Sequence, residues 1–277
     1  MSRHFWLRLK QDRLALWCLC FLALVLLAGL LAPWIAPHDP LLVSWRDKYH
    51  AIGMDYPLGA DHLGRCLFSR LLYGIRTTVF VSLLAMAVTL AFGMLIGMLA
   101  GYFRGRVDAV LMRMCDVMLS FPSEVMIFAL VGILGPGLGN IILAVLLVKW
   151  AWYARMIRGI VLQYSDRHYI HYARLIGAKP TYIILRHLLP VSAAEMAVLA
   201  TTDSGALILL LSALSFIGLG VQPPTPEWGA MLGEAKNILM VHPEQMLPAG
   251  IAIVLVVAAF NYLGDFLRDV LGGDGKN

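Results

Sequence analysis

Long apolar runs separated by short polar segments dominate the pattern along this chain. Six of the runs are long enough to cross the hydrocarbon core of a bilayer, which takes about 20 helical residues. They are predicted as spans at Leu14–Ala36, Thr77–Gly101, Leu111–Leu134, Leu138–Met156, Glu195–Leu219 and Ala249–Leu267. The sequence therefore predicts an all-α, polytopic integral membrane protein with six transmembrane helices.

Three of these runs carry a feature of their own. The first follows a basic N-terminal segment. It is longer than the apolar core of a signal peptide, about 7–15 residues, so we expect it to remain as a signal anchor. Gly93, Gly97 and Gly101 lie four apart in the second run, which predicts a face for close helix packing. Phe121-Pro122 predicts a kink in the third.

The distribution of charge sets the expected orientation. Lys and Arg gather on the N-terminal segment, around Arg104–Arg113, and between the fourth and fifth runs, which the positive-inside rule places in the cytoplasm with both termini. The chain of 277 residues is 60% hydrophobic and only 14% charged, which excludes an ordinary soluble domain. The net charge of +5 needs no nucleic acid as partner. The four cysteines show no metal-binding spacing and are expected to be free thiols.

Two polar segments are candidates for function. Tyr169–Pro190 is strongly basic, its first half has amphipathic helical spacing, and Gly177 permits a chain reversal. From the residues alone it is either an interfacial helix on anionic lipid or a docking element. Leu41–Arg76 is expected outside the cell; Asp61-His62 supplies only two candidate metal ligands, and packing on the helices is the favoured interpretation.

Several motifs resemble one family. Ala173, Gly177 and the closing Arg186–Pro190 resemble the EAA loop of binding-protein-dependent ABC importer permeases. The segment LGADHLGR with Ser69-Arg70 resembles LGTDxLGRDxxSR of the dipeptide, oligopeptide and nickel branch, and GVQPPTPEWG fits the same branch. The likeness covers Leu58 to Asp269, and KWAWYARMIRG is most similar to nickel permease C subunits.

The resemblance implies a type I ABC importer permease fold, with a cytoplasmic coupling helix inside the loop 159–194. It divides the chain into an N-terminal unit, 1–76, and a core transmembrane domain, 77–277. His171 stands where the family has glutamate, and Tyr172 where it has its first alanine. The ATPase-coupling residues that it implies are Tyr169, His171, Tyr172, Ala173, Arg174, Gly177, Ala178, His187 and Pro190.

The implied function is that of a permease subunit in an ATP-driven importer of the bacterial inner membrane. Nickel, free or chelated, is the expected substrate, and di- or oligopeptide is the alternative. The implied partners are a second homologous permease, two ATPase subunits, an extracytoplasmic binding protein and membrane lipid. The chain has no Walker A sequence, so ATP and Mg²⁺ are expected on the ATPase, with no cofactor and no catalytic residue here.

The sequence disfavours two other classes of protein. A self-contained channel or secondary transporter is disfavoured because six spans without an internal inverted repeat are few, and because a docking loop would have no purpose. An intramembrane enzyme is disfavoured because the sequence has no HExxH, no GxSxG and no paired intramembrane aspartates.

Charges within the predicted spans are candidates for the translocation pathway, because they are costly at membrane depth. These are Glu124, Lys149 and Asp203; Lys149 and Asp203 fall at matching depth, and we predict that they pair, either along the pathway or merely to lock two helices. The candidates for contact with the binding protein are Asp61, His62, Arg65, Glu227 and Trp228, with a structural role in the external loops as the alternative.

Overall fold

A computed structural model describes the backbone of residues 2–272 and the side chains of residues 7–270. Within this part the chain is helical and forms no β-strand. Single π-helical turns, Arg76–Phe80 and Ile184–Leu188, join α3 to α4 and α9 to α10. The α-helices are α1 Ser2–Gln11, α2 Arg13–Ile35, α3 Leu67–Ile75, α4 Val81–Phe103, α5 Gly105–Leu119, α6 Ser123–Leu134, α7 Leu138–Ser165, α8 His168–Leu175, α9 Pro180–Ile183, α10 Leu189–Phe216, α11 Trp228–Lys236 and α12 Leu247–Gly272.

Five helical segments are long and apolar enough to cross a membrane, and the bent pair α5–α6 makes a sixth if it counts as one span. This agrees with the six predicted runs, although several spans are longer than predicted; the fourth, for example, continues to Ser165. The second segment begins at Leu67 and the fifth at Pro180, because π-helical turns continue each span into residues predicted as loop. The predicted boundary between the N-terminal unit, 1–76, and the core transmembrane domain, 77–277, thus falls inside a continuous helical segment.

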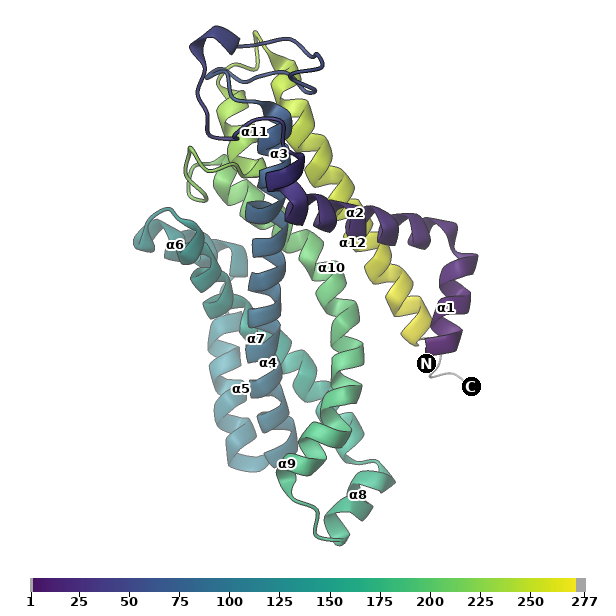
Figure 1. The fold of residues 1–277 in the computed structure, drawn as a ribbon. Coiled ribbons are helices and arrows are strands. Elements are labelled where there is room, and N and C mark those ends of the chain that lie inside the picture. The colour runs from purple at the N-terminus through teal and green to yellow at the C-terminus, as the bar shows by residue number, and fades with distance from the viewer. Residues whose placement is uncertain (1, 273–277) are drawn as a thin grey trace.

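The third span is broken rather than kinked. Its two halves meet at 80° across Ser120–Pro122, and α6 turns away from the bundle of α4, α5 and α7 (Figure 1). Pro122 stands directly before α6. Because proline has no backbone N–H to donate, α5 cannot continue through this position as a regular helix.

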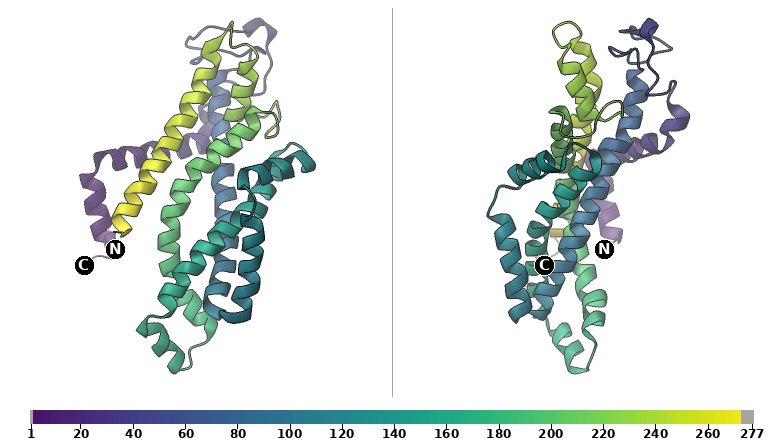
Figure 2. Two further views of the ribbon diagram at one scale, coloured as in Figure 1. Left: turned by 180° about the vertical axis from the view of Figure 1, so that it is seen from behind. Right: turned by 90° about the vertical axis from the view of Figure 1, so that its left-hand side faces the viewer.

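The buried apolar side chains form two main cores. Figure 2 shows the helices that enclose them from two further sides, with α12 in yellow. One core joins α2, α3, α11 and α12 at the end of the molecule that carries α11, here called the α11 end. The other joins α4, α6, α7 and α10 and continues to α8 and α9 at the opposite, α8 end. Helix α10 contributes to both cores, so it is the element that links the two ends.

The glycine face predicted in the second run packs against α7. A Cβ at Gly93 would lie 2.7 Å from the Cβ of Tyr153, and one at Gly97 would lie 2.5 Å from the carbonyl oxygen of Ala154. Gly101 is equally close to Val161. The prediction of close helix packing at this face is confirmed.

Helix α2 lies across α12 rather than along it (Figure 1). Pro33 has no N–H to donate to the carbonyl of Gly29, one turn earlier. Arg76 supplies the missing donor: its Nε donates to Gly29 O at 2.7 Å and its Nη2 to Leu30 O at 3.0 Å. The carbonyl of Gly29 thus has a hydrogen-bond donor, which lipid could not supply. The same contact ties α2 to the beginning of the second span.

Candidate functional site

The basic loop forms a sharp helical turn at the α8 end. Helix α8 is closed by Gly177, which has a φ of +78°. The N–H of Gly177 donates to Arg174 O at 3.1 Å, and the N–H of Ala178 donates to Ala173 O at 3.0 Å. This is the Schellman pattern, in which a left-handed glycine closes a helix. The predicted chain reversal at Gly177 is confirmed by its geometry.

Apolar side chains are exposed at the tip of this turn. We call the group Tyr172, Leu175, Ile176, Tyr182 and Leu185 the α8–α9 tip. Leu175 is 84% exposed, although an apolar side chain of this size is favoured in a core. Exposed basic residues stand beside it at Arg174, Lys179 and Arg186. An apolar patch rimmed by charge is typical of a surface that a partner covers.

Other residues of the loop hold it against the chain itself. Ile170, Ala173 and Ile183 are buried in the core of the α8 end. Ala173, one of the implied ATPase-coupling residues, is thus buried within the chain, and its small side chain serves packing there. The guanidinium of Arg174 lies over the ring of Tyr102, 5.1 Å from its centroid, which fixes α8 to the end of α4.

The remaining predicted loop residues fall on both sides of this turn. Tyr169 and His171 are exposed on α8. His187 lies between the rings of Tyr169 and Tyr182, with centroids 5.9 and 5.6 Å away. The π-helical turn ends with a hydrogen bond from the N–H of Leu189 to Ile184 O. Pro190 follows in the first turn of α10, where the helix continues without a break.

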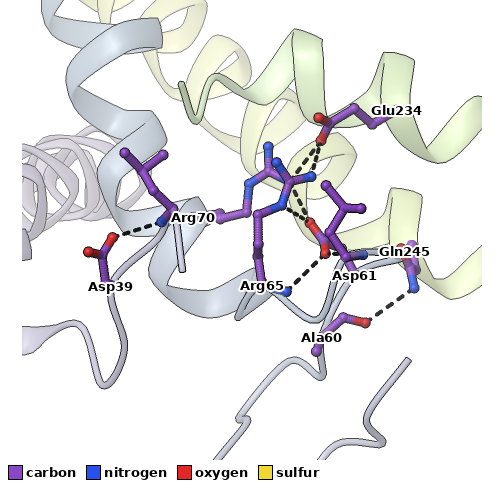
Figure 3. A network of polar contacts seen from close by, with 9 residues as sticks. Asp39, Ala60, Asp61, Arg65, Arg70, Glu234 and Gln245 are labelled. Carbon is purple, nitrogen blue, oxygen red and sulfur yellow. Dashed lines mark hydrogen bonds and ion pairs between the residues drawn. The ribbon is translucent and has the colours of Figure 1, made fainter. Parts of the chain in front are cut away.

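At the α11 end, four charged side chains form a buried ion network (Figure 3). Arg65 Nε lies 2.6 Å and Arg70 Nη1 lies 2.5 Å from Asp61 Oδ2, while both arginines also reach Glu234 Oε2, at 3.0 and 2.7 Å. Two arginines and two carboxylates balance in charge. Burial alone would raise the pKa of the Asp61 carboxyl, but Arg70, Arg65 and two backbone N–H donors outweigh it and lower that pKa.

A second polar group caps α11. The carboxylate of Glu227 accepts from Thr78 Oγ1 at 2.9 Å and from the N–H of Ala230 at 2.8 Å. The indole N–H of Trp228 donates to Leu71 O at 2.9 Å. These bonds fasten α11 to the first turns of the second span.

This burial corrects the predicted binding-protein contacts. Asp61, Arg65, Glu227 and Trp228 are at most 3% exposed within the chain, so they do not form an outer surface. His62 is the one member of the predicted set that is partly exposed. The structural alternative accounts for the four buried residues, since each of them bonds the external segment or α11 to the helices.

Between the two ends, two of the three translocation candidates, Lys149 and Asp203, line one cavity of about 230 Å³, here called the central crevice. Glu124 is not among its lining residues but lies 4.0 Å from Lys149. Its walls come from α7, α10 and the break between α5 and α6. The lining residues are Leu119, Ser123, Val148, Lys149, Trp152, Tyr153 and Asp203. At about 1.5 Å per residue, Lys149 lies about 24 Å from the end of α7 and Asp203 about 21 Å from the beginning of α10.

The predicted ion pair between Lys149 and Asp203 is wrong, although both residues reach the same crevice. Within residues 2–272 the only carboxylate within ion-pair distance of Lys149 is Glu124, at 4.0 Å. Asp203 Oδ2 instead accepts a hydrogen bond of 2.8 Å from the hydroxyl of Tyr153. Equal depth on neighbouring helices was insufficient, because side-chain direction around the helix axis decides which groups meet.

No group of three or more His, Cys, Asp or Glu side chains could hold a metal ion in the part of the chain that the structure describes. Cys18, Cys20, Cys66 and Cys115 are free.

Sequence reasoning missed three residues of these sites. Glu234 balances Arg65 and Arg70, and the excess of arginine over acid in LGADHLGRCLFSR was the signal that a second carboxylate was needed. Tyr102 supports Arg174, and Tyr153 holds Asp203; in apolar helices neither tyrosine gives a signal in the sequence.

Comparisons with known proteins agree with this arrangement. Residues 93–273 match the family model described as binding-protein-dependent transport system inner membrane component. Residues 1–51 match the N-terminal transmembrane domain of oligopeptide transport permease C.

Curated relatives match over nearly the whole chain. A metal-staphylopine import system permease protein of Staphylococcus aureus is 42% identical over 94% of this chain and 90% of its own. The nickel transport system permease of Escherichia coli K12 is 39% identical over 91% of each chain. A glutathione transport system permease of Escherichia coli O6:K15:H31 is 39% identical over 97% of this chain and 89% of its own.

The fold also matches a solved structure, the inward-facing MetNI methionine ABC transporter. The TM-score is 0.58 at 18% identity, over 74% of this chain and 97% of that one. This likeness concerns the fold alone. The family match over most of the chain and the curated relatives show that this protein belongs to the binding-protein-dependent inner membrane permeases of ABC importers, in the branch that holds the nickel and peptide transporters.

Proposed function

We propose that this chain forms half of the translocation pathway of an ATP-driven importer of nickel, free or chelated. The observation that carries the mechanical part is the continuous helical segment Pro180–Phe216. It bears Tyr182 and Leu185 of the α8–α9 tip at one end and Asp203 of the central crevice further along. A displacement of the tip by a partner would therefore move one wall of the crevice.

The α8–α9 tip supplies the surface for a separate ATPase. Its exposed apolar side chains would be covered by the partner, and its basic rim suits an acidic groove. In this proposal Tyr169, His171, Tyr172 and Arg174 face the ATPase, while Ala173, Gly177, Ala178, His187 and Pro190 set the shape of the turn. ATP and Mg²⁺ are bound by the ATPase subunits, and this chain needs no cofactor of its own.

The proposed orientation places the α8 end and both termini in the cytoplasm, because the basic residues gather there. The α11 end then faces the binding protein. With four of the predicted contacts buried, the surface available to that protein is formed by His62 and the exposed apolar side chains Ile52, Met54, Met240 and Val241. A second, homologous permease encloses the other half of the pathway.

The substrate is proposed from charge and from the relatives. Two carboxylates, Glu124 and Asp203, stand against one ammonium, Lys149, which favours the passage of a cation. Two of the relatives named above are described as metal or nickel permeases. The glutathione permease, of nearly equal identity, keeps a peptide importer as the second candidate.

Uptake by cells tests both candidates. Cells that lack the chromosomal copy of this chain would be supplied with the wild-type chain or none, and loaded with radioactive nickel in the presence or absence of excess dipeptide. Nickel uptake that depends on the chain, on ATP and on the binding protein, and that dipeptide does not inhibit, is expected. Dipeptide uptake without nickel uptake would overturn nickel and favour the second candidate.

A further inference from the structure

The central crevice lies where a membrane span is interrupted. Leu119 and Ser123, two of its lining residues, stand on either side of the 80° break between α5 and α6. Non-helical backbone at membrane depth is tolerated only where protein buries it or where it lines a water-filled cavity. Phe121 and Pro122 at the break are exposed, so protein does not bury this backbone within the chain. The break therefore lines a crevice that this chain by itself leaves open.

The charged groups of the crevice are only partly satisfied by the chain. The ammonium of Lys149 has three donors, and Glu124 Oε1, at 4.0 Å, is its one ionic partner among the described residues. Glu124 is 58% exposed and also accepts from the hydroxyl of Ser123, so it does not neutralise Lys149 tightly. Asp203 has one oxygen held by Tyr153, and within residues 2–272 no hydrogen bond reaches the other.

We propose that the central crevice is a transient binding site for an α-aminocarboxylate group, the head group of amino acids and of amino-acid chelators of metals. The inference rests on the proposed import function and names the part of the substrate that this chain contacts. Lys149 donates to the carboxylate of the ligand, and the free oxygen of Asp203 accepts from its amino N–H groups. A metal-bound amine still carries such N–H groups.

The size and the walls of the crevice fit this ligand. A volume of about 230 Å³, against about 30 Å³ for each water molecule in the liquid, is large enough for an amino-acid head group. The hydroxyl of Tyr153 fixes the Asp203 carboxylate in one orientation. Nickel without a chelator brings no carboxylate to accept from Lys149, so it makes one contact fewer in the crevice than a chelate does.

Trp152 lines the crevice and supplies a reporter, because Ni²⁺ bound beside an indole quenches its fluorescence. The transporter would be purified whole, through a tag on this chain, into lipid nanodiscs. It would be titrated with nickel–histidine, with nickel–histidinamide, which lacks the carboxylate, and with nickel chloride. The Trp152→Phe variant identifies the part of the signal that comes from the crevice.

Saturable Trp152 quenching by nickel–histidine is expected at about tenfold lower concentration than by the other two probes, the effect of one hydrogen bond between charged groups. Lys149→Met should remove that preference and Lys149→Arg should keep it. Thr201→Val is the matched control, because the Thr201 hydroxyl only bonds back to Ala197 O on the same helix as Asp203. Equal affinity of the wild type for all three probes would overturn the site, as would quenching that survives Trp152→Phe.

The outcomes separate this site from the proposed function. Chain-dependent nickel uptake by cells, with no preference among the probes at Trp152, refutes the site and keeps the nickel importer. If cells take up dipeptide instead of nickel, and Trp152 quenching still prefers nickel–histidine over nickel–histidinamide and nickel chloride, the nickel importer is refuted and the site stands.

Discussion

Two groups of charged side chains lie inside this molecule, and they differ in how closely the chain itself pairs opposite charges. In the buried ion network at the α11 end, both arginines are 1% exposed and four contacts of 3.0 Å or less join them to Asp61 and Glu234. In the central crevice, Lys149 is 26% exposed and its one ion pair measures 4.0 Å. The closed group is suited to hold the fold, and the open group is free to meet a ligand.

The cost of breaking each group follows from its burial. Removing one partner of a buried ion pair strands a charge and costs about 3–5 kcal/mol, whereas an exposed pair contributes about 0–1 kcal/mol. In this account, a charge inside the molecule indicates a functional site where the chain leaves it without a close partner of opposite charge. The two groups can therefore be separated by comparing stability with transport.

The largest effect on stability is expected from Asp61→Asn. Arg65 and Arg70 would keep only Glu234 as partner, at a cost of about 3–5 kcal/mol, which lowers the thermal midpoint by roughly 10 °C. Thermal unfolding of the solubilised complex measures it. The matched control is Asp55→Asn, since Asp55 is an exposed acid of the same segment. That substitution should change stability by at most about 0.5 kcal/mol. An unchanged midpoint for Asp61→Asn would show that the network does not stabilise the fold.

Gly177→Val is expected to abolish coupling while leaving the rest of the chain folded. The backbone of Gly177 has a φ of +78°. A β-branched residue in this conformation is strained by about 1–2 kcal/mol, and the turn that presents the α8–α9 tip would open. ATP hydrolysis by the complex should then no longer depend on substrate, and uptake should stop. Gly177→Asn is the matched control, since asparagine tolerates this conformation. Normal uptake by a correctly inserted Gly177→Val variant would contradict the role of the turn.

A smaller effect is expected from Tyr102→Leu, which removes the ring beneath Arg174. A cation–π contact contributes about 0.5–1 kcal/mol at an exposed site, so uptake should fall about two- to fivefold through looser positioning of α8. Tyr102→Phe keeps the ring and should retain normal uptake. Equal rates for the leucine and phenylalanine variants would show that the contact plays no part.

The smallest effect is expected from pH. The pKa of Asp61 is lowered in the folded protein. Its ordinary value is about 3.9, so the network contributes its full stability above that pH. The contribution is lost as pH falls below about 4, through the folded pKa. Protection factors for hydrogen exchange in segment 41–66, which correct for the pH dependence of intrinsic exchange, should therefore stay constant from neutral pH down to about 4.5 and fall only in more acidic buffer. A fall near pH 6 would point to another group.

Much of the fold was predictable because the length of the apolar runs indicates the spans. The placement of Lys and Arg predicts their orientation. The glycine spacing at Gly93–Gly101 and the turn at Gly177 were predictable for the same kind of reason, since each depends on local backbone chemistry. Contacts between side chains far apart in the sequence were not predictable. Glu234 lies 169 residues from Arg65, and the direction in which Lys149 and Asp203 leave their helices is fixed by packing, not by depth.

The comparison between the two groups is tested most directly by uptake per folded transporter for Lys149→Met. Glu124, the carboxylate that would lose its partner, is well exposed. The loss should therefore cost at most about 1 kcal/mol and leave the thermal midpoint within about 4 °C of the wild type. Uptake of nickel–histidine should fall about tenfold. A midpoint that drops as far as in Asp61→Asn, with unchanged uptake per folded complex, would show that the crevice charges hold the fold and do not serve transport.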